Sequence, residues 1–156
     1  MNLLKFHNKI KGYTQNRQPG IEADMEPKPI AELEEYKAAG KLENKVALIT
    51  GGDSGIGRAI AILYAKEGAN VAIGYYDEHQ DAEDTVNRLQ EMGVKAKAYA
   101  HDLKDEKQSQ KLIKDVINDF GSLNILVNNG GVQFPRDHFE DITPQQVKIG
   151  RASCRE

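Results

Sequence analysis

One stretch decides the fold of this chain, Val46-Ala47-Leu48-Ile49-Thr50-Gly51-Gly52-Asp53-Ser54-Gly55-Ile56-Gly57. It is an apolar strand that runs directly into a glycine-rich turn, and an apolar helix follows the turn. In an α/β sheet this order presents backbone N–H groups and a helix N-terminus to a diphosphate. The glycines let the chain turn tightly and let the backbone approach the diphosphate. Ordinary turn glycines are the alternative, and the flanking strand and helix count against it.

Outward from this turn, strand patterns alternate with helix patterns. Strands are expected at 46–50, 71–75, 95–100 and 123–127, and helices at 56–66, 78–92 and 104–120. Repeated alternation of this kind forces parallel strands joined by right-handed crossovers. The sequence therefore predicts an α/β fold, a doubly wound parallel sheet of the Rossmann type, of which the N-terminal half with about four strands is present. The polar–apolar alternation of 95–100 favours a place near the edge of the sheet.

Composition and charge exclude several classes of protein. With 156 residues the chain has room for one domain with its own core. Its net charge of −3 argues against nucleic acid as a main partner, and no apolar run is long enough to cross a bilayer. The first residues lack the features of a secretory signal, so a cytoplasmic location is expected. Cys154 is the only cysteine and the four histidines lack metal-ligand spacing, so no disulfide or metal site is expected.

The chain divides into three parts by composition. Residues 1–44 hold three prolines and blocks of charge, and we interpret them as an N-terminal extension that lies along a domain surface or stays mobile. A solvated tail is favoured over a partner-binding arm, and residues 31–37 are compatible with a short helix that ends at Gly40. Residues 45–147 form the nucleotide-binding half-domain. Residues 148–156 resemble a translated sequencing adapter, and we interpret them as a non-native tail.

Three motifs in order carry a resemblance to a known family. They are Thr50-Gly51-Gly52-Asp53-Ser54-Gly55-Ile56-Gly57, Asp102 after the third strand, and Asn128-Asn129-Gly130-Gly131 after the fourth. The chain thereby resembles the short-chain dehydrogenase/reductase family, whose pattern is T-G-x-x-x-G-x-G, an aspartate, and N-N-A-G. Gly130 departs from the usual alanine, an exchange that costs no space. The extension is similar to that of a bacterial subgroup, the glucose/ribitol dehydrogenase-like or general-stress oxidoreductases.

The resemblance implies an activity and a coenzyme. It implies an oxidoreductase that uses NAD or NADP and transfers hydride between the nicotinamide and a carbonyl or alcohol substrate. The diphosphate of the coenzyme would be bordered by three glycines of the turn, Gly51, Gly55 and Gly57. Ser54 and Ile56 would lend it backbone N–H groups, and Gly130 and Gly131 would lie against the nucleotide. In its full-length form such a protein is expected to be a homo-oligomer, a dimer or a tetramer.

The resemblance also places residues around the adenosine. Asp102 would accept a hydrogen bond from the adenine amino group, with Leu103 beside the ring. The alternative for Asp102 is the N-cap of the helix expected at 104–120, and the two roles are compatible. Asn129 would lie by the adenine ribose, whereas Asn128 would tie neighbouring strands by hydrogen bonds.

The choice between NAD and NADP stays open. An acidic residue at the end of the second strand usually binds the ribose 2′-OH, and here that place is taken by Tyr75. Asp77, 20 residues after Gly57, is close to the expected spacing for that acid. No arginine follows the strand, and Ser54 stands where many NADP-binding members carry a basic residue. A solvated loop residue or a cap for the helix at 78–92 is the alternative for Asp77.

The reactive groups of the family are expected to be missing. Its chemistry needs a tyrosine with a lysine four residues later, together with a serine and an asparagine. None of the six tyrosines has such a lysine, so no catalytic residue is assigned and the chain alone is expected to be inactive. A non-catalytic dinucleotide-binding sensor or scaffold is the alternative function. A methyltransferase is a third possibility, which the Asn128–Gly131 element speaks against.

Overall fold

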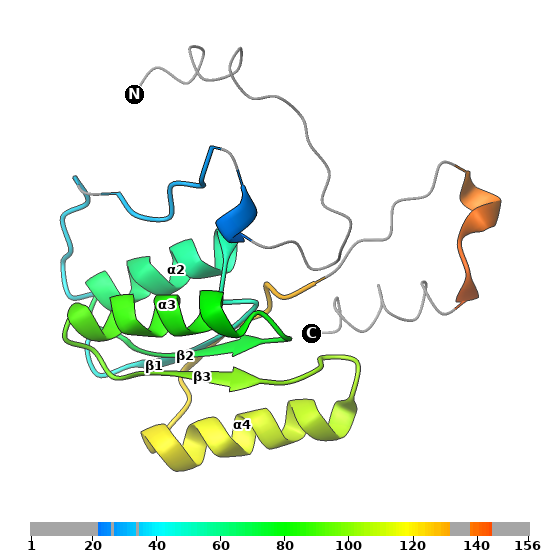
Figure 1. Ribbon diagram of the computed structural model, residues 1–156. Coiled ribbons are helices and arrows are strands. Elements are labelled where there is room, and N and C mark those ends of the chain that lie inside the picture. The colour runs from blue at the N-terminus through cyan, green and yellow to red at the C-terminus, as the bar shows by residue number, and fades with distance from the viewer. Residues whose placement is uncertain (1–21, 26, 34, 132–137, 145–156) are drawn as a thin grey trace.

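Four parallel strands and three α-helices form the main body of the described chain (Figure 1). The computed structural model describes residues 22–25, 27–33, 35–131 and 138–144. The main elements are β1 (Val46–Thr50), α2 (Gly55–Lys66), β2 (Asn70–Tyr75), α3 (His79–Glu91), β3 (Ala96–Ala100), α4 (Glu106–Phe120) and β4 (Ile125–Val127). Two short 3₁₀ turns, η1 (Glu22–Asp24) and η2 (Phe139–Asp141), lie outside the sheet. The tail interpreted as non-native, 148–156, falls outside the described residues.

The strand order of the sheet is β3-β2-β1-β4, and every pairing is parallel. Ala47 of β1 lies opposite Val71 on one side and Ile125 on the other. The chain therefore winds outward from β1 to β3 and then returns to place β4 on the far side of β1. Ligands of such sheets bind outside the carboxyl ends of the strands at this reversal point. The predicted doubly wound sheet is confirmed, and so is the place of β3 at its edge.

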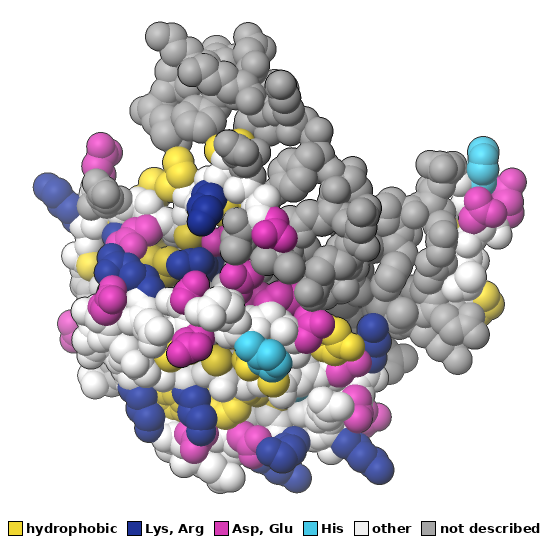
Figure 2. Space-filling model, in the orientation of Figure 1, with side chains coloured by type: hydrophobic (Ala, Val, Ile, Leu, Met, Phe, Trp, Pro, Cys, Tyr) yellow, Lys and Arg dark blue, Asp and Glu magenta, His cyan; other side chains and the backbone are white. Residues whose placement is uncertain are grey.

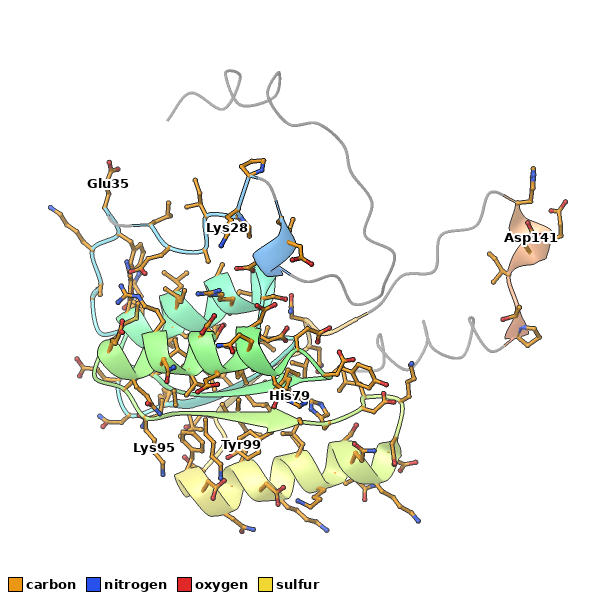
Figure 3. The ribbon with its side chains drawn as sticks, viewed as in Figure 1. Lys28, Glu35, His79, Lys95, Tyr99 and Asp141 are labelled. Atoms are coloured by element: carbon orange, nitrogen blue, oxygen red, sulfur yellow. The ribbon has the colours of Figure 1, made fainter. Side chains whose placement is uncertain are left out.

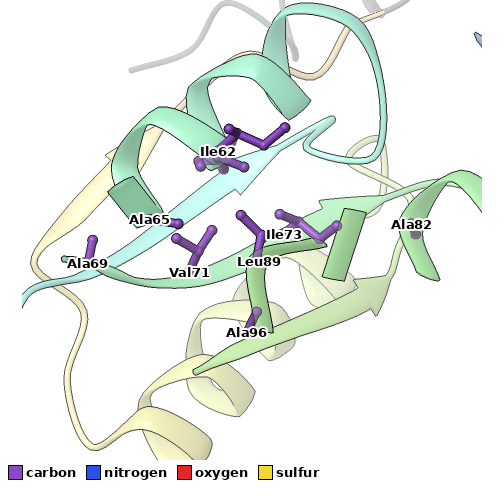
Figure 4. Close-up of a cluster of buried hydrophobic side chains, with 10 residues drawn as sticks. Ile62, Ala65, Ala69, Val71, Ile73, Ala82, Leu89 and Ala96 are labelled. Atoms are coloured by element: carbon purple, nitrogen blue, oxygen red, sulfur yellow. The ribbon is translucent and has the colours of Figure 1, made fainter. Parts of the chain in front are cut away.

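Two apolar layers pack the helices onto the sheet. The layer under α2 and α3, shown in Figure 4, consists of Ile49, Ala61, Ile62, Ala65, Ala69, Val71, Ile73, Ala82, Leu89 and Ala96. The layer under α4 consists of Val46, Leu48, Ala72, Leu112 and Val116. Leu48 and Ile49 serve opposite layers because successive side chains of a strand point to opposite faces. Since all of β1 is buried, its continuous apolar run is explained, and the turn that follows has a rigid base.

Polar contacts fix α4 against the edge strand β3. The Tyr99 hydroxyl donates a hydrogen bond to Asp119 Oδ2 at 2.7 Å, and Lys97 Nζ lies 2.6 Å from the same oxygen. Figure 3 shows Tyr99 between β3 and α4. Burial raises the pKa of Tyr99, and its hydrogen bond to Asp119 adds to this rise. The edge strand is thus held by its own helix, and the loop between β3 and α4 starts from a fixed point.

Most element boundaries differ from the expected ones by one or two residues, and two differences have a clear physical cause. Helix α4 begins at Glu106 rather than at residue 104, because Asp105 is its N-cap and accepts hydrogen bonds from Lys107 N (2.8 Å) and Gln108 N (3.3 Å). The short helix expected at 31–37 is absent from the described residues there. Glu32 instead pairs with Lys66 and Arg88, and Tyr36 donates to Glu67, and these long-range contacts outweigh the local helix propensity.

The described part of the extension, residues 22–25, 27–33 and 35–44, is called the N-terminal arm below. It runs beside α2 and α3, on the side of the sheet opposite α4 (Figure 1). Glu32 forms ion pairs with Lys66 of α2 and Arg88 of α3, both at 3.0 Å. Partial burial opposes ionisation of Glu32, but hydrogen bonds from Lys66 and Arg88 outweigh it and lower the pKa of its carboxyl. This carboxylate therefore fastens the arm to both helices at once.

Glu67, the C-cap residue of α2, is the second anchor of the arm. Its buried carboxylate accepts hydrogen bonds from the Tyr36 hydroxyl, from Ala39 N (3.1 Å) and from Lys41 N (2.8 Å). The hydrogen bond from Tyr36, followed by that from the Lys41 backbone, lowers the pKa of Glu67 to about 2. The arm is thus joined to α2 by backbone donors as well as by side chains.

Candidate functional site

The glycine-rich turn closes tightly over the end of β2. The N–H groups of Gly51 and Gly52 both donate to the carbonyl oxygen of Gly74, at 2.7 and 3.2 Å. Gly51 has a φ of +62°, and a Cβ atom there would lie 2.9 Å from Gly130 Cα. A Cβ atom at Gly57 would collide with the carbonyl oxygen of Gly51. Only glycine fits these two positions, so the turn brings the start of α2 against the ends of β1 and β4.

The N-terminus of α2 presents backbone donors beside this turn. Its N-cap Ser54 makes no side-chain capping bond, and its first turn carries no acidic residue. Gly55 has a φ of +52°, and no atom lies within 4 Å of the place where its Cβ would be. The Ile56 side chain is 74 % exposed. Backbone N–H groups at a helix start, the positive end of the helix dipole and open space at a glycine are what an anionic diphosphate requires. The N–H of Gly55 is already bonded to the Glu22 carboxylate (2.5 Å), so the neighbouring N–H groups of the turn are the ones that fit a dinucleotide.

Thr50 and Asn129 lock the end of β4 to the turn. The Asn129 side-chain amide donates to the carbonyl oxygens of Thr50 and Gly51, both at 3.0 Å. Thr50 Oγ1 in turn accepts the N–H groups of Asn129 (3.1 Å) and Gly130 (2.9 Å). The structure thus gives Asn129 the strand-tying role that the sequence analysis expected of Asn128. Because both donors of the Asn129 amide group are used here, only its Oδ1 is left for a ribose.

The surroundings of Gly130 leave little room for the alanine methyl group that the family usually has at this position. A Cβ atom at this position would lie 3.0 Å from Leu103 Cδ1 and 3.1 Å from Gly51 N. Leu103, expected beside the adenine, therefore lies directly against the backbone that follows β4. The glycine itself costs no space, as expected, and the Leu103 side chain lies close to the place that an alanine methyl would take.

Asp102 follows β3 at the carboxyl edge of the sheet. Its Oδ1 accepts a hydrogen bond from Lys104 N at 2.9 Å, and its own N–H donates to Gln108 Oε1 at 3.0 Å. The alternative interpretation of Asp102 as the N-cap of α4 is wrong, because Asp105 holds that position. Asp102 closes the turn before the helix instead. Its contact with adenine stays a prediction.

At the end of β2, Tyr75 has a partner of its own. Its hydroxyl lies 2.9 Å from His79 Nδ1, and the two rings meet edge to face. Burial raises the pKa of Tyr75, and the nearby charge of Asp53 acts in the same direction. The N-cap of α3 is Glu78, so the alternative that made Asp77 the cap of this helix is wrong. Asp77 N donates to Glu78 Oε2 at 3.4 Å, which keeps two acidic residues together after the strand.

Asp53, inside the turn, is a residue that the sequence analysis did not single out. It is buried, and its carbonyl oxygen accepts a hydrogen bond from Thr85 Oγ1 of α3 at 2.8 Å. Burial raises the pKa of its carboxyl, and the negative charges of Asp81 and Glu22 add to the rise. In the sequence, only the place of Asp53 in the middle of the turn could have indicated that it is buried and joins the turn to α3. Figure 2 shows acidic and basic side chains interspersed on the face of the molecule that is turned to the viewer.

Comparison with known proteins agrees with this geometry. The sequence profile described as short chain dehydrogenase matches residues 45–149. This chain belongs to the short-chain dehydrogenase family. The resemblance stated from the three motifs is thereby confirmed, and the turn, Asp102 and the Asn128–Gly131 element all fall within the matched region. The described residues include no group of three or more side chains placed to hold a metal, and no helix among them is long and apolar enough to span a membrane.

Individual members of the family show how far the likeness extends. General stress protein 39 of Bacillus subtilis is 48% identical over 145 residues, which are 93% of this chain and 51% of that protein. A short chain dehydrogenase of Burkholderia cenocepacia in complex with NADP is 36% identical, with a TM-score of 0.67 over 72% of this chain and 47% of that one. NAD+-bound xylitol dehydrogenase is 29% identical, with a TM-score of 0.65 over 72% of this chain and 45% of that one.

These comparisons bear on two further expectations. The chain spans about half the length of the curated relatives it matches. The subgroup inferred from the extension is confirmed by the general stress protein, whose match is longer than the half-domain alone. The two dehydrogenase structures hold NADP and NAD+ respectively, so the predicted coenzyme class, a nicotinamide dinucleotide, is that of these relatives.

Proposed function

We propose that this chain is the coenzyme-binding part of an NAD(P)-dependent oxidoreductase. The whole protein would transfer hydride between the nicotinamide and a carbonyl or alcohol group of a small molecule, of the size of a sugar or a simple aldehyde. The observation that carries this proposal is the N-terminus of α2, which has no side-chain cap from Ser54 and lies beside a turn that accepts only glycine at the reversal point of the sheet. Family membership supports it.

The residues of the turn would hold the coenzyme by its diphosphate. The N–H groups of Ser54 and Ile56 would donate to the phosphate oxygens, and Gly55 leaves the space they need. Asp102 would accept the adenine amino group, with Leu103 against the ring. Asn129 Oδ1 would face the ribose, and the backbone at Gly130 and Gly131 would line the nucleotide. When bound, the nicotinamide supplies the hydride chemistry.

The residues at the end of β2 would decide whether the protein binds NAD or NADP. Tyr75 is paired with His79, and the acidic Asp77 and Glu78 follow it. An acid at this place favours the free 2′-OH of NAD over the 2′-phosphate of NADP. One matched relative nevertheless binds NADP. Both coenzymes are therefore part of the test.

We propose that the chain of 156 residues binds a coenzyme without catalysing a reaction. The residues four places after its tyrosines are Arg17, Gly40, Gly68, His79, Gln80 and Leu103, and none is a lysine. The reactive residues of the whole protein would lie in the part of its relatives that this chain does not match. We propose a cytoplasmic dimer or tetramer as its assembled form. A non-catalytic sensor would bind the coenzyme equally well but would lack a tyrosine–lysine pair in the rest of the reading frame.

The experiment is a fluorescence titration with NADH and with NADPH. It uses the protein expressed from the complete reading frame that contains these residues, together with two variants. Gly55→Ala places a methyl group in the open space at the turn, and Gly93→Ala is the control, because its φ of +87° is equally left-handed and its surroundings equally open. Both cost about 1–2 kcal/mol of backbone strain. Only Gly55→Ala should weaken coenzyme binding, and a wild-type protein that binds neither coenzyme would refute the proposal.

A further inference from the structure

The N-terminus of α2 is capped by a residue from the arm. Ser54 stands at the N-cap position but makes no side-chain capping bond. Instead, Glu22 Oε2 accepts the hydrogen bond of Gly55 N at 2.5 Å, across 33 residues of sequence. The side chain of an N-cap residue normally accepts the N–H of the second or third helical residue, so the N–H of Gly55, the first helical residue, needs an acceptor from elsewhere. The carboxylate of Glu22 supplies that acceptor.

The charge of this carboxylate is compensated locally. Glu22 Oε1 lies 3.0 Å from Nη1 of Arg58, on the first turn of the same helix. The two side chains are only 11 % and 24 % exposed, so the ion pair is shielded from solvent. Glu22 N also donates to Asp81 Oδ2 of α3 at 3.4 Å, and Met25 N donates to the carbonyl oxygen of Glu22. Glu22 is therefore held from both its backbone and its side chain.

This contact bears on the donors that the diphosphate needs. Glu22 uses the N–H of Gly55, the residue between Ser54 and Ile56, and it holds the left-handed backbone of that residue in place. The two neighbouring N–H groups are the ones assigned to the diphosphate. A donor pair fixed before binding pays less conformational entropy when the ligand arrives. Pairing with Arg58 keeps the carboxylate from repelling the phosphates.

We infer that Glu22 is a positioning residue of the coenzyme site, which caps the cofactor helix at Gly55 and holds residues 54–56 in their binding conformation. The inference rests on the proposed function, because it concerns the same turn. It makes the N-terminal arm part of the coenzyme site rather than a solvated tail. The opposing possibility is that the Glu22 carboxylate competes with the diphosphate for the helix end.

The first experiment compares coenzyme affinity among variants of the protein from the complete reading frame. Glu22→Ala removes the acceptor and should weaken binding of both NADH and NADPH about tenfold, the size of effect that loss of a cap produces. Glu22→Gln keeps an oxygen for Gly55 N–H and should restore most of the affinity. Glu35→Ala removes an arm carboxylate that is exposed and points away from α2 and α3 (Figure 3), and it should leave affinity unchanged.

A second pair of variants tests the charge compensation. Arg58→Gln leaves the carboxylate of Glu22 unpaired beside the turn. It should weaken NADPH more than NADH, since the 2′-phosphate adds negative charge. Adding Glu22→Gln to Arg58→Gln should recover part of the loss. Damage that is merely structural would deepen in the double variant. Tighter coenzyme binding by Glu22→Ala than by wild type would establish competition and overturn the inference.

A measurement without coenzyme separates this inference from the proposed function. Amide hydrogen exchange across residues 53–58 should accelerate in Glu22→Ala and stay unchanged in Glu35→Ala, because the cap holds this segment in the free protein. Unchanged exchange in Glu22→Ala would overturn the inference whatever the protein binds. If exchange responds but wild type takes up neither coenzyme, the positioning contact stands and the proposed function fails.

Discussion

The glycine turn and the N-terminal arm are held in place by different forces. The turn is fixed by steric fit and short backbone hydrogen bonds, such as those of Gly51 and Gly52 to Gly74. The arm is fixed mainly by carboxylates: Glu22 and Glu32 of the arm reach α2 and α3, and Glu67 at the end of α2 accepts hydrogen bonds from the arm. The first kind of contact responds to the volume of a side chain, and the second responds to pH and salt. The glycine turn is therefore the rigid part of the site, and the arm beside it is attached by electrostatic contacts.

The largest loss of stability and of coenzyme binding is expected in the glycine turn. Gly57→Ala would drive a methyl group into the carbonyl oxygen of Gly51, and the helix would have to shift away from the turn. Overpacking of this kind costs about 1–3 kcal/mol or more. Urea denaturation should show the loss of stability, and NADH titration should show no binding. Coenzyme binding at wild-type affinity by Gly57→Ala would contradict the steric account.

A somewhat smaller effect is expected at Thr50. Thr50→Val keeps the shape but removes the hydroxyl oxygen that accepts the N–H groups of Asn129 and Gly130. Leaving these groups without their partner costs about 1–3 kcal/mol. Urea denaturation of Thr50→Val and of Thr50→Ser, which retains the hydroxyl, measures this difference. Equal stability of the two variants would show that the hydroxyl does not join β4 to the turn.

The arm should come loose in acid through Glu67. Its pKa is lowered from 4.5 to about 2 in the folded protein. A group with a lowered pKa stabilises the fold fully above its unfolded value, so this contribution is complete above pH 4.5 and is lost as the pH falls through about 2. Glu67→Gln should flatten that part of the stability profile. Glu35→Gln serves as the control, and an identical acid profile for wild type and Glu67→Gln would refute the assignment.

The smallest effect is expected at Glu32. Its ion pairs with Lys66 and Arg88 lie near the surface, and such pairs contribute about 0–1 kcal/mol. Glu32→Gln should therefore leave the unfolding midpoint almost unchanged while making the arm more susceptible to limited proteolysis. Added salt should have the same effect on wild type and little further effect on the variant. Strong destabilisation of the whole domain would show that the arm is part of its core.

The sheet and the turn could be predicted from the sequence because their signals are local. The apolar run Val46–Thr50 predicts a buried strand, and the glycines at 51, 55 and 57 predict the turn. The contacts of Glu22, Glu32 and Glu67 could not be predicted, since each joins residues that are more than twenty positions apart. A carboxylate in a charged block gives no sign of the cation or N–H group it will meet.

Two assignments in the site could not be divided correctly between neighbours of the same type. Asp102 and Asp105 both precede α4, and only the structure shows that Asp105 takes the cap while Asp102 closes the preceding turn. Asn128 and Asn129 both follow β4, and the one that faces the turn is set by the pleat of a short strand. In both pairs the residue type was informative, and its exact position depended on backbone geometry that the sequence does not encode locally.

The contact between Leu103 and Gly130 has an evolutionary consequence. Because a methyl group at 130 would lie 3.0 Å from Leu103 Cδ1, we expect the residues tolerated at these two positions to depend on each other. We expect Gly130→Ala to be tolerated best when residue 103 is smaller or turns aside. Residue 103 is also proposed to contact the adenine. A substitution in the loop after β4 is therefore expected to affect how the loop after β3 contacts the coenzyme.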